Sequence, residues 1–164
     1  MGFAHLLRTW AALTAFRARF NIPQDVNVEF CLKGDIENNR LPRVVFFPLM
    51  SILKGGVRFP VNPILLRTLS SYSFSLDQCL PNFYRVVNSV IHLNNLYNLG
   101  LNHHDIKFMY SICGSLKTDH YLKIRNPIVR LISCLLDFNR NSAGEFIKVS
   151  GNWLASKLTC PTSP

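Results

Sequence analysis

Apolar residues in the first part of the chain follow first a helical and then a strand period. Spacings of three and four residues predict an amphipathic helix over residues 4–20. This apolar stripe consists of Phe3, Leu6, Trp10, Leu13, Phe16 and Phe20. Val26, Val28, Phe30 and Leu32 then alternate with polar neighbours, which predicts a half-buried strand or an extended arm. The polar run after it predicts a surface loop over residues 33–43.

Prolines and capping residues mark the middle of the chain. Pro48 suits the first turn of a short helix over residues 48–54, which Gly55 and Gly56 would end. Asn62 is placed to cap a helix that begins at Pro63, because the residue before a proline avoids the α conformation. Ser75 and Gln78 have the spacing of a capping box, so residues 75–79 are expected to form a single helical turn.

The second half of the chain contains the clearest helical pattern. Residues 81–97 carry an apolar stripe opposite a polar face, and Gly100 would end that helix. A further helix is expected from the capping residue Asn102 to Gly114. Strands are expected over 121–125, 131–136 and 146–149, although the run 128–136 fits a helix or a strand.

Helices therefore precede strands, and this order predicts an α+β fold. We expect a mostly helical single domain with a small C-terminal antiparallel sheet. The expected division is an N-terminal helical extension over residues 1–12, the domain over 13–154 and a flexible tail over 155–164.

The composition indicates a globular chain with an excess of positive charge. The 164 residues are 48% hydrophobic and 16% charged, which excludes a disordered chain and suffices for one hydrophobic core. There are 18 Lys and Arg against 9 Asp and Glu, a net charge of +9. This excess fits a polyanionic partner, but it also fits a solvated surface that lacks acids, because the basic residues are dispersed.

Several classes of site find no support in the residues. The five cysteines include no close pair, which argues against a zinc ribbon and favours reduced thiols in an intracellular compartment. The longest uncharged stretch is rich in asparagine and is not typical of a membrane span. The basic N-terminal segment fits the first helix of the domain better than it fits an organellar transit peptide.

The one concentration of histidine and carboxylate is His103-His104-Asp105 together with Asp119 and His120. Adjacent helical histidines point about 100° apart, so capping of a helix start explains them better than a metal site. Nucleophile elbows, phosphate-binding loops and metal-binding carboxylate triads are missing from the sequence. We therefore expect no enzymatic activity, no catalytic residue, no metal, no cofactor and no small-molecule substrate.

Several ordered blocks give the chain a family resemblance from about Leu13 to Trp153. The most specific are GVRFPVNP, which begins at Gly56, and LPNFYR, which begins at Leu80. The other matching residues are Phe20 to Pro23 with Asp25 and Val26, Phe46-Phe47 ahead of Leu49 and Leu53, Gln78, Phe108, Tyr110, Tyr121, Arg125 and Phe146 to Trp153. With these blocks the chain resembles the plant gypsy-type transposon protein domain, which is encoded in retroelements.

The resemblance implies a retroelement-derived, gag-like plant protein of the nucleus or cytoplasm without an established enzymatic activity. It supplies no site residues. Its alternatives are a self-association scaffold and a decayed structural remnant that binds no nucleic acid.

Four arginines near the specific blocks are the candidate nucleic-acid contacts: Arg58, Arg67, Arg85 and Arg125. They would contact phosphates, and Tyr84 or Tyr121 would stack on bases. The competing interpretation is structural, with Arg85 holding its helix to a loop carbonyl and the tyrosines in the core. The expected partner is nucleic acid bound without sequence preference, or a second copy of the chain.

Overall fold

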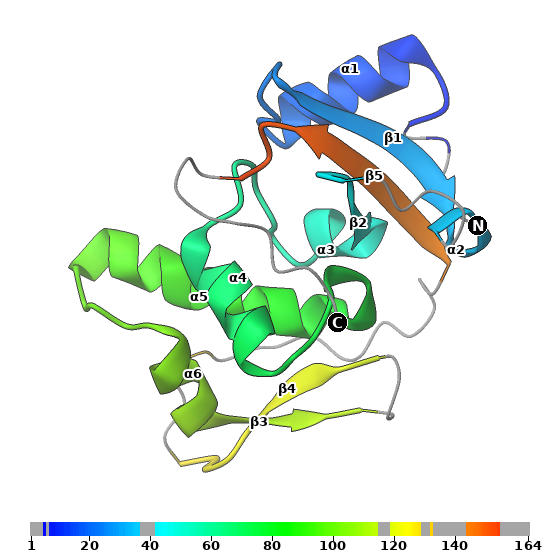
Figure 1. Ribbon diagram of the computed structural model, residues 1–164. Helices are drawn as coiled ribbons and strands as arrows, with labels where there is room; N and C mark the ends of the chain where they lie inside the picture. Colours follow the sequence, from blue (N-terminus) through cyan, green and yellow to red (C-terminus); the bar gives the residue numbers. More distant parts are fainter. Residues whose placement is uncertain are drawn as a thin grey trace.

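The chain combines helices with two small antiparallel sheets, which gives an α+β fold (Figure 1). The computed structural model describes His5 and residues 7–36, 42–114, 119–128, 132 and 144–154. The helices are α1 (Trp10–Arg19), α2 (Lys33–Ile36), α3 (Leu49–Leu53), α4 (Pro63–Ser71), the 3₁₀ turn η2 (Leu76–Gln78), α5 (Pro81–Tyr97) and α6 (His103–Met109). The strands are β1 (Val26–Leu32), β2 (Val45–Pro48), β3 (Tyr110–Cys113), β4 (Tyr121–Ile124) and β5 (Glu145–Gly151).

The first and last of these strands are neighbours in one sheet. β5 lies between β1 and β2 and is antiparallel to both, with Val149 opposite Val28 on one side and Val45 on the other. The expectation of a sheet confined to the C-terminal part is therefore wrong. The apolar alternation of β1 correctly predicts a strand, but its partner comes from the other end of the chain, which no local pattern reveals.

The helix expected from Asn102 to Gly114 is too long. The predicted cap is present, because Asn102 and Asp105 form a capping box, but α6 ends at Met109. The backbone becomes extended at Tyr110, and β3 pairs with β4 in an antiparallel hairpin. Pairing with β4 thus overrides the helical spacing, and the sequence Tyr-Ser-Ile-Cys is itself rich in strand-favouring side chains.

Two further boundaries differ from expectation. Residues 33–36 form the turn α2 rather than a loop, because Ile36 is buried with Cys31, Phe46 and Phe146 on the outer face of the sheet. The first helix begins at Trp10 rather than residue 4, and the Thr9 side chain caps it by accepting from the Ala12 N–H at 3.1 Å.

The remaining local signals are confirmed. Asn62 caps α4 by accepting from the Ile64 N–H, Ser75 and Gln78 form a capping box, and α3 occupies most of the predicted 48–54 helix. α5 has the predicted bounds, although Asn98 in the left-handed conformation ends it rather than Gly100. The strand expected over 131–136 and the tail over 155–164 lie outside the described residues, Ile132 excepted.

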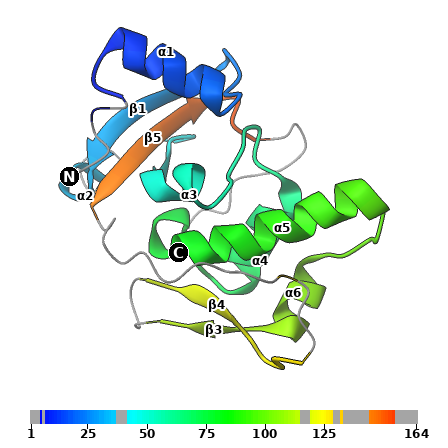
Figure 2. The ribbon, with the colours of Figure 1, turned by 180° about the vertical axis from the view of Figure 1, so that it is seen from behind.

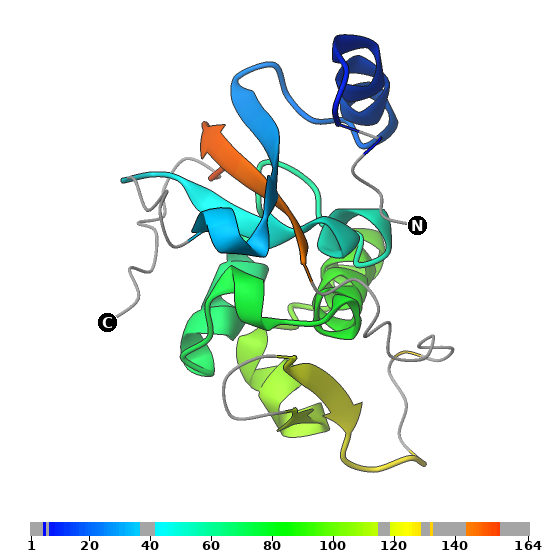
Figure 3. The ribbon, with the colours of Figure 1, turned by 90° about the vertical axis from the view of Figure 1, so that its right-hand side faces the viewer.

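The elements stack in three tiers, as Figures 1 and 3 show from the front and the side. The upper tier holds α1 with β1 and β5, the middle tier α3, α4 and α5, and the lower tier α6 with the β3–β4 hairpin. One hydrophobic core runs through all three, from Phe16 of α1 to Ile106 of α6. From behind, α1, α3 and α5 face the viewer (Figure 2).

Candidate functional site

The four predicted arginines fall into two separate groups. Arg58 and Arg85 belong to a group near the C-terminal end of α1, whereas Arg67 and Arg125 lie in the tier of α6 and the β3–β4 hairpin or just above it. The structure therefore offers two candidate surfaces rather than one.

The first group centres on the ring of Phe20, which is only 7% exposed. The guanidinium of Arg19, at the end of α1, lies 5.5 Å from the ring centroid, and that of Arg58 lies 5.4 Å from it. Cation–π contacts at these distances orient both side chains. Two exposed cations from distant parts of the sequence thus contact the same aromatic ring.

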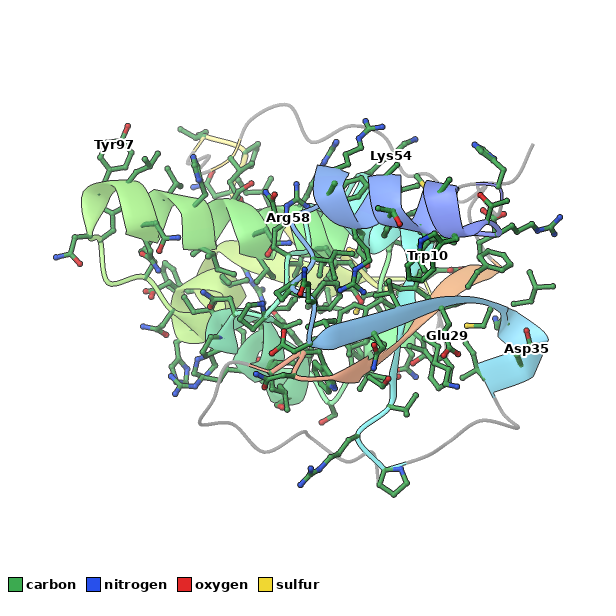
Figure 4. All side chains as sticks on the ribbon, turned by 90° about the horizontal axis from the view of Figure 1, so that it is seen from above. Trp10, Glu29, Asp35, Lys54, Arg58 and Tyr97 are labelled. Carbon is green, nitrogen blue, oxygen red and sulfur yellow. The ribbon has the colours of Figure 1, made fainter. Side chains whose placement is uncertain are left out.

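Arg85 and Lys54 extend this group toward α5. The Nε of Arg85 donates to the Lys54 carbonyl oxygen at 3.0 Å, and the Asn88 side chain donates to the Gly55 carbonyl oxygen at 2.9 Å. Arg85 therefore holds α5 to the end of α3, as its structural interpretation predicted, and it is half-buried. Lys54 and Arg58 are exposed, and both are labelled in Figure 4. We call Arg19, Lys54, Arg58 and Arg85 the Phe20 cluster.

Acidic residues are missing from the elements that build this cluster. α1, residues 42–76 and α5 contain no Asp or Glu. In the part of the chain that the structure describes, the one ion pair joins Lys148 to Glu29 across the sheet at 3.2 Å. Figure 4 places Glu29 and Asp35 by β1 and α2, on the other side of α1 from Lys54. The charge of the Phe20 cluster is therefore not neutralised within the described residues.

The second group surrounds the contact between α4 and α6. Lys107 donates to the Ser71 carbonyl oxygen at 2.9 Å and lies 4.9 Å from the centroid of the Tyr72 ring. The Nε of Arg125 donates in turn to the Lys107 carbonyl oxygen at 3.3 Å. Arg67 is exposed on α4. We call Arg67, Lys107 and Arg125 the α6 cluster.

The pKa of His103 reflects the positive charge of the α6 cluster. Its pKa is lowered, first by partial burial and then by the nearby charges of His104, Arg67 and Lys107, while Asp105 opposes the shift. His103 is therefore predominantly neutral at pH 7, and the three permanent cations set the charge of this surface.

Of the two predicted stacking residues, the structure excludes Tyr84. Tyr84 is fully buried, and its hydroxyl donates to the Leu76 carbonyl oxygen, so Tyr84 cannot meet a base. Tyr121 is half-buried in β4. The sequence missed two exposed aromatic residues instead: Trp10, expected on the apolar face of the first helix, is 83% exposed, and Phe108 is 84% exposed.

The described residues offer few groups suited to catalysis or to metal binding. No three His, Cys, Asp or Glu side chains there gather as metal ligands. Burial, with smaller effects of nearby charges, raises the pKa of Cys31 to about 11 and that of Cys79 well above its usual value. Both thiols are therefore protonated at neutral pH and are poor nucleophiles.

A search for helices able to cross a bilayer finds none among the described residues. Comparison of the chain with protein-family models, with curated proteins and with solved structures finds no match. The two basic surfaces are therefore the candidate functional sites of the chain.

Proposed function

We propose that this chain is a non-enzymatic domain that binds nucleic acid, without sequence preference, through the Phe20 cluster. One observation carries the proposal: Arg19 and Arg58 converge on one ring while none of the described carboxylates pairs with them. Like charges that lack a carboxylate partner repel one another, so a polyanion bound across this surface is stabilised by both arginines.

The chemistry of the cluster favours phosphate. Guanidinium groups match phosphate oxygens with paired N–H donors, and Lys54 adds a point charge. The Phe20 ring orients Arg19 and Arg58, and the Lys54 carbonyl oxygen holds Arg85, so three of the four cations have defined positions. Phosphate contacts of this kind set position and affinity but carry no sequence information.

The resemblance to the plant gypsy-type transposon domain supports a retroelement origin for this activity. A gag-like role would bring the chain into contact with nucleic acid in the nucleus or the cytoplasm. We include this origin and location in the proposal.

Replacement of Arg58 by glutamine tests the proposal most simply. Arg58→Gln is expected to weaken binding of fluorescein-labelled oligonucleotides of unrelated sequence by a similar factor, because one phosphate contact is lost from each. The measurement is fluorescence anisotropy at about 50 to 200 mM salt, where counterion release is easily seen. Arg58 is exposed, so the variant is expected to fold.

Lys33→Gln is the matched control. Lys33 is also exposed, but it follows β1 whereas Phe20 precedes it, so seven strand residues separate it from the cluster. The control is expected to bind like the unaltered chain. Equal losses in both variants would mean that only net charge matters, and the Phe20 cluster would be rejected as the site. Self-association that persists at high salt, with no oligonucleotide retained, would support the scaffold alternative.

A further inference from the structure

Phe108 is displayed to solvent from a well-anchored helix. The side chain is 84% exposed, although its neighbour Ile106 is fully buried and the capping box of Asn102 and Asp105 fixes the start of α6. Lys107, the residue before Phe108, is anchored to α4 through Ser71. An exposed aromatic residue on a rigid element forms a platform that a flat ligand can cover at little entropic cost.

The cations nearby are those of the α6 cluster. Arg125 is hydrogen-bonded to the Lys107 carbonyl oxygen, and its backbone N–H donates to the Met109 carbonyl oxygen at 3.0 Å, so Arg125 lies beside the part of α6 that carries Phe108. The Lys107 ammonium lies on the adjacent face of α6, toward α4. Arg67 projects from α4, which packs against α6. Asp105 is the one acid of α6, and its carboxylate accepts a hydrogen bond from the backbone N–H of Asn102 at 2.8 Å. None of the three cations has an ion-pair partner within the described residues.

We propose that Phe108 and the α6 cluster bind single-stranded nucleic acid, with an unpaired base stacked on Phe108 and flanking phosphates on Arg67, Lys107 and Arg125. The inference rests on the proposed function and specifies the form of nucleic acid that it prefers. Bases in a duplex are stacked on one another and cannot cover a protein ring, whereas bases in a single strand can.

This ligand satisfies both features of the surface. An apolar protein partner would cover Phe108 but would also remove water from the exposed cations Arg67 and Arg125, which is unfavourable because neither has an ion-pair partner within the described residues. A duplex would contact the cations and leave Phe108 in water. Single-stranded nucleic acid supplies a π-face and phosphates together, and this combination is typical of single-strand binding proteins.

Phe108→Ala in the full chain provides the test. The probes are a labelled oligothymidylate of about 12 nucleotides, within the usual range of site sizes, and a duplex of equal length. Loss of one stacked base is worth about 1–3 kcal/mol, so single-strand affinity is expected to fall about 5- to 150-fold. Duplex affinity is expected to stay the same.

Two variants keep the result interpretable. Ile128→Ala removes an apolar side chain that is 90% exposed near Arg125 and is expected to leave single-strand binding unchanged. Phe108→Trp, in a Trp10→Phe background, is expected to retain the affinity and to show quenched indole fluorescence when oligothymidylate binds. Thermal melts of all variants should match that of the unaltered chain, because these side chains are exposed.

The outcomes separate this inference from the proposed function. If Phe108→Ala binds both probes as before while Arg58→Gln still weakens binding, the α6 surface is wrong and the Phe20 cluster stands. Equal losses on the single strand and the duplex would also overturn base stacking. If the unaltered chain binds neither probe, both proposals fail.

Discussion

The buried histidine of this fold makes its stability sensitive to acid. The ring of His120 stacks on Phe74 with centroids 3.8 Å apart, and within the described residues its Nδ1 has no hydrogen-bond partner. Burial lowers the pKa of His120, while Asp119 opposes the shift. The unfolded chain therefore binds more protons than the folded chain once the pH falls through the ordinary histidine range, and folding is weakened there.

We expect the free energy of unfolding to decrease when the pH is lowered from about 7.5 to about 5, as protons bind the unfolded state preferentially. His103, whose pKa is also lowered, contributes in the same direction. His120→Phe keeps a ring against Phe74 and should remove part of this dependence. Urea unfolding at both pH values measures the effect, and an unchanged pH dependence in the variant would rule out His120 as its source.

At the level of elements, the Phe20 cluster depends on how closely α3 and α5 approach each other. Gly55 follows α3 at the point where α5 passes, and a Cβ there would lie 2.7 Å from the Cβ of Tyr84 and also against the backbone of Ser51. Neither neighbour is the end of a flexible side chain. Gly55 therefore sets the distance at which Arg85 reaches the Lys54 carbonyl oxygen.

Gly55→Ala is expected to lower the free energy of unfolding by about 3 kcal/mol, because the two helices must move apart. Gly34→Ala is the control: nothing lies within 4 Å of its added Cβ, and alanine favours the helical turn α2. The control should be neutral or stabilising by up to about 1 kcal/mol. Urea denaturation compares them, and similar stabilities for the two variants would refute the close approach.

Local signals in the sequence predicted local structure well. The caps at Asn62, Ser75 and Asn102 were found because each capping side chain bonds backbone only two or three residues away. The pairing of Val28 with Val149 was missed because its partners lie at opposite ends of the chain. The same distinction applies to the candidate site. Arg58 was predicted as a contact because of its sequence block. That Arg19 and Arg58 both contact the Phe20 ring depends on the folded chain, and no local sequence pattern reveals it.

Across the described part of the molecule, five acids serve local structure, and none of them pairs with the cations of the two basic clusters. Asp25 accepts from Asn152, Glu29 pairs with Lys148, and Asp35 accepts from the Leu32 N–H. Asp77 and Asp105 accept in the same way from the Ser75 hydroxyl and the Asn102 N–H. The Phe20 and α6 clusters therefore have no carboxylate partner within the described residues, and this asymmetry, together with the net charge of +9, favours a polyanion as partner.

The salt dependence of nucleic-acid affinity tests this account most directly. Each phosphate contact adds about 0.7 (single strand) to 0.9 (duplex) to the slope of log affinity against log salt. The triple variant Arg19→Gln, Lys54→Gln, Arg58→Gln should therefore lose about 2 to 3 from the slope of the unaltered chain, equally on two oligonucleotides of unrelated sequence. An unchanged slope, with the variant folded, would show that the Phe20 cluster does not contact phosphate.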